Sequence, residues 1–460
     1  MYEPSPVDIA DPSSRYQQDI KEPSAHADYV PFIDVYNPDD VNEPRTSRSA
    51  PATTIAGQAR GSPTKVITHA RVQRGNGTGH VSRLITDIRI SVLGMKKSLV
   101  IPIALLLVLL SCRKDEDPDA VTGTPDPPAD TSPVSFDLSL VPYDSLSSYG
   151  FFEGPLSDFN PSSGVIPFAP INALFSDYAH KDRFLWMPQG TGATYESDSS
   201  SFVFPNGAVM IKTFSYEHTL PSNERRILET RMIFKRNGVW EFAKYVWNEE
   251  QTEAVYDMNG RLVPILFTDD SGTAHDVVYA MPSETECLTC HKKGQASTPI
   301  GVKPQNLNSA FAYPEGLANQ LDTWTQMGYL QGGLPGVINT VTDWQDVSQP
   351  LNERVRGYLD VNCAHCHTDG RYCDYRPMRF GWEESDDPAM LGVCVEPHNP
   401  LLPIHSHIVK PGNLEKSLLY YRVNSGQDGI RMPLIGRTLI HEEGRQLIAD
   451  WIDSLTQTCN

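Results

Sequence analysis

Two short stretches of the chain combine two cysteines with a histidine in the order Cys-x-x-Cys-His. The members are Cys287, Cys290 and His291 in the first stretch and Cys363, Cys366 and His367 in the second. Thiols at this spacing reach both vinyl groups of a haem, and the histidine that follows places its imidazole beneath the iron. Each motif therefore predicts one covalently attached haem c, with iron bound by His291 or His367.

Two other readings of these motifs involve no haem. A single zinc ion shared between the two cysteine pairs would require pairs about 15–20 residues apart, as in zinc ribbons, and the gap here is far longer. A thioredoxin-like dithiol would sit in a βαβ pattern, which neither motif has around it. Zinc and redox thiols also leave the histidine after each pair without a role, so both rank below haem.

A second axial ligand is expected for each iron, and methionine is the usual partner of histidine. Met432 precedes Pro433 in a loop before the last helix, which makes it the candidate at the second haem, with a packed loop methionine as the alternative. Met378 and Met390 are weaker candidates. At the first haem the sixth ligand stays open, because Met327 falls on a helical face that predicts core packing. His365 is interpreted as a spacer inside the second motif.

The segment that begins at Met95 has the pattern of a bacterial lipoprotein signal. Lysines precede an apolar run, Leu99–Leu110, which is followed by Ser111 and Cys112. Cleavage before Cys112 and acylation of this cysteine would anchor the protein to a membrane. A polar, Pro-rich tether then covers residues 112–134. Residues 1–94 are interpreted as an extension ahead of the true start, or as a disordered cytoplasmic tail.

Composition narrows the partners and the compartment. The 460 residues carry a formal net charge of -19, which argues against nucleic acid as a partner, because phosphate binding needs clustered Lys and Arg. In an oxidising compartment nearby cysteines usually pair. Cys373 and Cys394 both lie between Cys366 and Met432, so we expect a disulfide between them.

The patterning of the remaining chain predicts an α+β multidomain protein. Residues 135–280 are expected to form an antiparallel β-rich domain, with hairpin turns at Asn237-Gly238 and Asn259-Gly260 and a strand pair around Pro205-Asn206-Gly207. Residues 281–346 form the first haem-binding segment, with a helix that places Leu317, Leu321, Trp324 and Met327 on one face and ends at Gly328. Residues 347–460, with an apolar helix at each end, predict a class I cytochrome c-like domain, so both haem segments are expected to be α-helical.

The chain also resembles a bacterial family of dihaem c-type cytochromes, most of whose members are conserved hypothetical proteins. The resemblance extends roughly from Asp144 to the C-terminus. It rests on both haem motifs and on four further stretches, namely Asn172–Ala179, Tyr245–Asn248, Val409–Asn413 and Arg431–Pro433 with the following Gly436-Arg437. The resemblance implies two haems and an exported, often lipid-anchored protein, and it names no substrate.

The leading functional hypothesis is an electron carrier on the periplasmic side of the cell envelope, anchored to the outer membrane and serving an unidentified redox protein. A peroxidase-like haem enzyme is the main alternative, and it requires an open coordination position at the first haem. A third reading makes the β-rich domain a docking module, with the haems as relay or sensor. The number of ligands at the first iron distinguishes electron transfer from catalysis.

Overall fold

The computed structural model describes residues 132–269 and 271–459. All of these residues belong to one compact unit. Residues 1–94, the predicted signal segment 95–111, the lipidation site Cys112 and most of the tether lie outside the described residues. Within the described ranges, no helix has the length and apolar character needed to cross a bilayer.

Helices are short and few, and strands dominate the first half of the described chain. The helical segments are the 3-10 turns η2 (Ser147–Tyr149) and η3 (Leu156–Asp158) and the helices α2 (Glu284–His291), α3 (Pro304–Leu307), α4 (Gln320–Gln326), α5 (Leu351–Asn362), α6 (Leu418–Val423) and α7 (Glu442–Ser454). The strands are β1 (Phe152–Glu153), β2 (Asn160–Pro161), β3 (Ile166–Pro167), β4 (His180–Trp186), β5 (Ala193–Thr194), β6 (Val209–Thr219), β7 (Glu224–Arg236), β8 (Val239–Trp247), β9 (Ala254–Tyr256), β10 (Arg261–Thr268), β11 (Ala274–Met281), β12 (Lys292–Lys293), β13 (Ala296–Ser297), β14 (Ala310–Tyr313), β15 (Gly316–Asn319) and β16 (Leu330–Gln331).

One antiparallel sheet of eight strands organises this unit. Its strand order is β11-β10-β6-β7-β8-β9, and β4 joins β6 and carries β3 on its other side. The β-rich character predicted for residues 135–280 is therefore confirmed. The turn at Asn237-Gly238 joins β7 to β8 with φ of 52° and 80°, so the predicted hairpin is confirmed.

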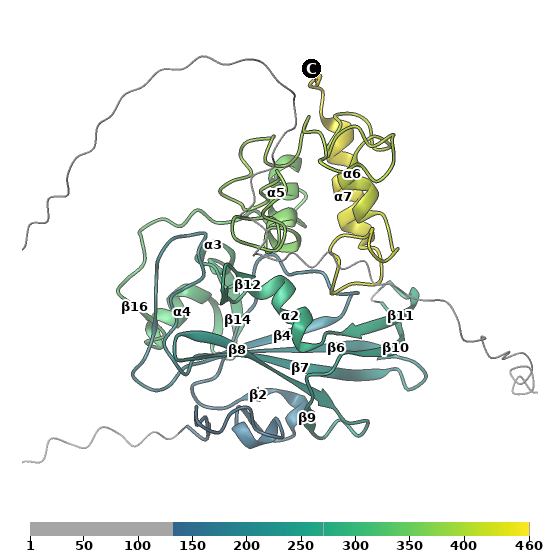
Figure 1. Cartoon of the computed structure of the whole chain (residues 1–460). Coiled ribbons are helices and arrows are strands. Elements are labelled where there is room, and N and C mark those ends of the chain that lie inside the picture. The colour runs from purple at the N-terminus through teal and green to yellow at the C-terminus, as the bar shows by residue number, and fades with distance from the viewer. Residues whose placement is uncertain (1–131, 270, 460) are drawn as a thin grey trace, which may run out of the picture. The chain divides into compact units, whose positions relative to one another are not determined.

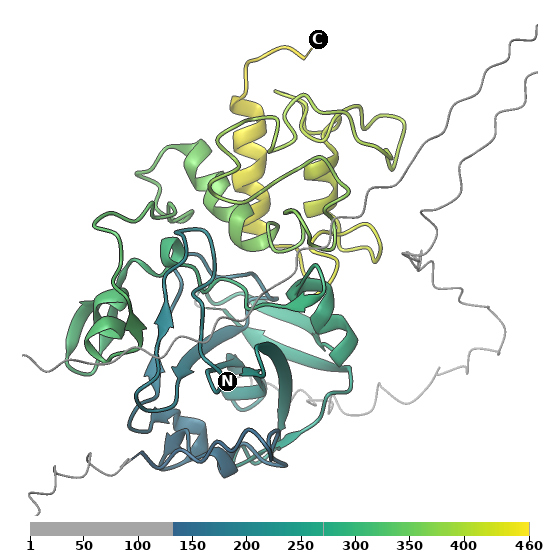
Figure 2. The same cartoon turned by 60° about the vertical axis from the view of Figure 1, so that its left-hand side comes forward.

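The two faces of the sheet differ, because successive side chains along a strand point to opposite sides. One face is apolar: Phe184, Ile211, Met232 and Ala243 are partners across four neighbouring strands and share one buried cluster with Tyr149 and Phe151. Each large side chain buried in this way stabilises the fold by roughly 1.5–3 kcal/mol. Figures 1 and 2 show the sheet between the N-terminal segment with β1 and β2 and the segment with α5, α6 and α7.

Two predicted strand pairs are wrong. The chain around Asn259-Gly260 links β9 to β10, but these strands do not pair: β9 is an edge strand beside β8, and β10 lies between β11 and β6. At Pro205-Asn206-Gly207 the chain turns into β6, but Val203 forms only an isolated bridge with Thr194. A local turn signal did not reveal that β6 pairs instead with β4 and β7.

The expected α-helical cytochrome c domains are not found. Strands make up 27% of the described residues and helices 17%, so the haem-motif segments are not helical domains. In residues 281–346 the longest helix is α2, and short strands separate it from α3 and α4. From Cys363 to Ser417 the described chain forms turns and isolated bridges without a helix. Loops held by backbone hydrogen bonds fill the space that further helices would occupy in a helical domain.

Two helices at the ends of residues 347–460 do form and pack together. Trp451 on α7 donates its indole N–H to Asn352 on α5 at 3.1 Å. Gly444 on α7 lies directly against Tyr358 on α5, where a Cβ would approach the Tyr358 ring and hydroxyl to about 2.2 Å. The close approach of α5 and α7 therefore depends on the missing side chain at position 444.

A buried carboxylate connects this C-terminal part to the sheet. Asp177, just before β4, accepts hydrogen bonds from the backbone N–H groups of Thr438 and Leu439, both at 2.7 Å. Phe175 donates its backbone N–H to Asn362 at the end of α5, and its ring stacks on His441 at 4.1 Å. The stretch Asn172–Ala179 thus holds the loop after Met432 and the end of α5 against the sheet.

The predicted disulfide is wrong. Cys394 is bonded to Cys459, and Cys373 is a buried free thiol. Cys373 donates its backbone N–H to the carbonyl of Cys366 at 2.9 Å, which keeps it beside the second motif. The Cys394 backbone N–H donates to the Val409 carbonyl at 3.0 Å, and Gly412, three residues after Val409, donates to Ile452 near the end of α7, which places Cys394 near the C-terminal tail.

Candidate functional site

The first motif occupies the last turns of α2, a helix that begins at a capping box. The Ser283 backbone N–H donates to Glu286 at 2.8 Å, which starts the helix four residues before Cys287. Cys287 and Cys290 are three residues apart and therefore share a helix face. Together with His291 they line a cavity of about 180 Å³ between α2 and the sheet face opposite the aromatic core.

His291 is oriented in the way expected of a metal-binding imidazole. Its Nδ1 lies 2.9 Å from the carbonyl oxygen of Thr298, which fixes Nδ1–H as the donor and leaves Nε2 free to bind a metal. Burial lowers the pKa of His291 to about 4, so the ring is neutral at pH 7. A neutral imidazole with one free nitrogen fits an iron ligand.

The second motif follows α5 without a break. The backbone N–H of Cys363 still bonds to Leu359 in the helix, and that of His367 bonds to Cys363 at 3.0 Å, so the motif forms one tight turn. His367 is buried, and burial lowers its pKa to about 4. Its Nδ1 has no hydrogen-bond partner among the described residues, so this imidazole is neutral and its nitrogens are available to a metal.

The structure brings Met432 to the second motif. Met432 lines the same cavity as Cys363 and His367, which has a volume of about 230 Å³. Arg437 holds the Met432 carbonyl from Nε at 3.0 Å and from a terminal nitrogen at 2.8 Å, which anchors the loop. The residues around this cavity fit a haem with histidine on one side and methionine as the candidate second ligand.

The structure distinguishes among the other candidate methionines. Met378 also lines the cavity of the second motif, and Met390 does not. Met327 is 46% exposed just after α4, so the prediction that it packs in the core is wrong. Leu321 and Trp324 are buried on α4 as predicted, while Leu317 belongs to β15 and is exposed.

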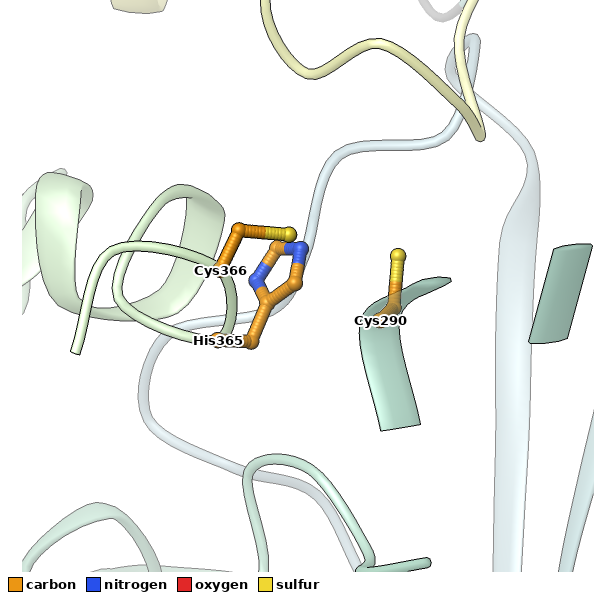
Figure 3. Close-up of side chains that lie close together, drawn as sticks. All are labelled: Cys290, His365 and Cys366. Carbon is orange, nitrogen blue, oxygen red and sulfur yellow. The ribbon is translucent and has the colours of Figure 1, made fainter. Parts of the chain in front are cut away.

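The two motifs contact each other, which sequence spacing did not reveal. Ligand atoms of Cys290, His365 and Cys366 all lie within 4.8 Å of one another, and Figure 3 shows His365 and Cys366 across from Cys290. The Cys366 thiol also lies 3.9 Å from the carbonyl of Thr289. The hydrogen bond from Cys366 holds the pKa of Cys290 well below its usual range, and that of Cys366 is raised.

His365 is the residue whose position most changes its interpretation. It was predicted to be a spacer, but its side chain is buried and lines the cavity of the first motif. Its Nδ1 has no hydrogen-bond partner among the described residues. The available signal was its residue type, since a histidine between two motif cysteines offers a third soft ligand.

Comparison of the chain with protein-family models, with curated proteins and with solved structures gave no match. Its function is therefore inferred from the chemistry of these residues and from their arrangement.

Proposed function

We propose that the protein is an exported dihaem c-type cytochrome that carries electrons through two covalently bound haems. Cys287 and Cys290 would hold one haem with His291 as its ligand, and Cys363 and Cys366 would hold the other with His367. When bound, each haem supplies an iron that takes up and releases one electron. The chain contributes attachment, imidazoles held neutral by burial, and cavities that limit the access of water.

One observation carries this proposal: sulfur atoms from the two motifs, those of Cys290 and Cys366, lie within 4.8 Å of each other. Haems bonded to these sulfurs would begin at neighbouring atoms, which suits transfer of an electron from one to the other. Two unrelated haem sites would not require this contact. A relay that exchanges electrons with a second protein benefits from it, because the electron must cross between the two sites.

The ligands available at the first site favour electron transfer over catalysis. Its cavity contains His291 and a second imidazole, that of His365. If both imidazoles held the iron, it would have no open position, whereas a peroxidase-like enzyme needs one. The absorption and EPR spectra of the haem-loaded protein test this point, because a five-coordinate high-spin iron at the first site would favour the enzyme.

Haem content tests the proposal directly. Protein produced with c-type maturation machinery should contain two haems per chain by pyridine haemochrome titration, and both should survive denaturing electrophoresis. The variant Cys287→Ser/Cys290→Ser should retain one haem. The matched control is Cys373→Ser, which removes a buried thiol outside the motifs and should retain two. One haem or none in the unaltered protein would overturn the proposal.

A second candidate function is binding of a soft or borderline metal ion, favoured by the cluster of Cys290, His365 and Cys366. Two thiolates and an imidazole suit Zn²⁺, with water as a fourth ligand. Haem-free, reduced chain titrated with Co²⁺ should then develop thiolate-to-metal absorption that Cys366→Ser abolishes and Cys363→Ser retains. Equal Co²⁺ binding by the Cys366→Ser and Cys363→Ser variants would contradict the proposal of a metal site at this cluster.

The place of this function is proposed to be the cell envelope, with Cys112 as the lipid anchor. The apolar run before Cys112 supports this proposal. Cys112→Ser should release the protein from the membrane fraction or block its processing. Unchanged fractionation and unchanged mass would count against the anchor.

A further inference from the structure

Four cationic side chains form a continuous row beneath the first motif. The strand register pairs Arg183 on β4 with Lys212 on β6, Lys212 with Arg231 on β7, and Arg231 with Lys244 on β8. All four residues line the cavity that also contains Cys287, Cys290 and His291. They lie on the sheet face opposite the aromatic core, because their sequence neighbours Phe184, Ile211, Met232 and Ala243 belong to that core.

Of the four cations in the row, only Arg231 forms an ion pair with a described carboxylate, that of buried Glu229. Like charges directly opposite each other on neighbouring strands destabilise a sheet. The other carboxylates nearby have partners of their own: Asp182 pairs with Arg225, Asp257 pairs with Arg261, and Glu286 is bonded to Ser283.

Lys212 lies between Arg183 and Arg231 in this row. No described residue accepts a hydrogen bond from its ammonium or forms an ion pair with it, and the ammonium lies 4.9 Å from the centroid of the Phe214 ring. Burial and the neighbouring cations Arg183, Lys181 and Arg231 hold the pKa of Lys212 well below its usual range. In Arg231, Nε is buried without a partner among the described residues. Both groups would gain from an anion in the cavity.

We propose that this row binds the two propionate carboxylates of the haem held by the first motif. The inference rests on the proposed function. The remaining lining includes Phe242, Ile300 and Val302, so the cavity suits a ligand with an apolar body and acidic groups at one edge. Carboxylates would supply partners for Lys212 and for the Arg231 Nε–H, and charge-assisted hydrogen bonds are the stronger kind. A small inorganic anion would satisfy the row but leave the apolar lining uncovered.

The proposal predicts that one substitution shifts the melting temperature in opposite directions in the haem-free and the haem-loaded protein. Lys212→Met keeps an unbranched side chain and removes the charge. In haem-free chain it should raise the melting temperature by a few degrees, because an uncompensated cation is lost. In haem-loaded chain it should lower the melting temperature, because a partner of the propionates is lost. The control Lys235→Met lies on β7 outside the cavity, where Lys235 donates to the Phe204 carbonyl, and it should shift both forms equally.

A second measurement addresses the carboxylates themselves. Haem-free chain should bind added haem more tightly than haem dimethyl ester, and Lys212→Met should reduce that difference by about tenfold, which corresponds to ~1.4 kcal/mol. The proposal would be overturned if Lys212→Met shifted the melting temperature in the same direction in both forms. It would also be overturned if the chain bound haem and its dimethyl ester equally tightly. Equal stabilisation of haem-free chain by inorganic phosphate would overturn it too. Failure of the proposed function would be seen separately, as a chain without covalent haem after maturation.

Discussion

The regions around the two motifs meet the needs of a haem by different structural means. The first-motif region consists of α2 and the sheet face below it, where regular strands supply a cationic floor and the Thr298 carbonyl orients His291. The second-motif region runs from α5 to Cys459, where long loops surround His367 and bring Met432 into its cavity. The first site is a feature of a sheet, and the second depends on cross-links that hold loops in place. Substitutions in the two regions should therefore have different effects on the stability of the protein and on its haems.

The largest expected effect is on the cross-link of the second-motif region. Cys459→Ser removes the Cys394–Cys459 disulfide, whose partners are 65 residues apart. Loss of a loop of this length should lower the free energy of unfolding by about 4 kcal/mol in the chain-entropy picture. Denaturant unfolding followed by Trp fluorescence measures this change. An equal loss in Cys373→Ser, which removes a free thiol, would show that the disulfide has no special role.

A smaller loss of stability is expected from acid, through His441, which packs against Phe175, Trp344 and Tyr358. Burial lowers the pKa of His441 to about 4 in the folded protein. Below pH 6.5 the His441 imidazole takes up a proton in the unfolded chain but stays neutral in the folded chain. The free energy of unfolding therefore falls as the pH drops from 6.5 to 4. The loss from this one group should reach about 3 kcal/mol.

Replacement of His441 tests whether this histidine causes the fall in stability at low pH. His441→Phe keeps a ring in the contact and removes the proton, so the fall in stability between pH 6.5 and pH 4 should become shallower by that amount. Unfolding free energies of the two proteins at a series of pH values give the comparison. Parallel curves for the two proteins would mean that other groups cause the acid sensitivity.

A smaller effect, confined to one haem, is expected at Met432. A thioether favours ferrous iron, so Met432→Ala should lower the midpoint potential of the second haem by on the order of 0.1 V within the roughly 0.8 V range that axial ligands set. The weak sulfur-to-iron band of the ferric protein should disappear, while the potential of the first haem stays nearly constant. The matched control is Met378→Ala, which alters the same cavity. An unchanged potential and band in Met432→Ala would make Met432 a packing residue.

The smallest effect is expected where α5 and α7 cross. In Gly444→Ala the new Cβ meets the Tyr358 ring, and overpacking of this kind costs about 2 kcal/mol, but alanine regains about 1 kcal/mol of helix propensity. The net loss of unfolding free energy should therefore be about 1 kcal/mol, measured by chemical denaturation. The double variant Gly444→Ala/Tyr358→Leu should recover part of it, since the clashing ring is removed. A stabilised single variant would mean that the helices separate freely.

Local patterns were reliable where neighbours in sequence are also neighbours in space. The Asn237-Gly238 turn, the helix before Cys363 and the helix near the C-terminus were predicted correctly, because each depends on a few adjacent residues. The Asn259-Gly260 hairpin and the Cys373–Cys394 disulfide were wrong, because each assumed that closeness in sequence means pairing. The helical domains were wrong for a related reason: apolar stripes identified two helices, but loops cannot be read from periodicity.

The sequence alone determined the chemistry that this protein offers: two pairs of thiols, each with an adjacent imidazole, and a methionine before a proline. These signals are local, and residue type and spacing are sufficient to find them. Only the tertiary structure decided that Cys290, His365 and Cys366 meet and that Arg183, Lys212, Arg231 and Lys244 align beneath the first motif. Each of these contacts joins segments far apart in the chain, and strand register and loop closure set them through the packing of the whole unit.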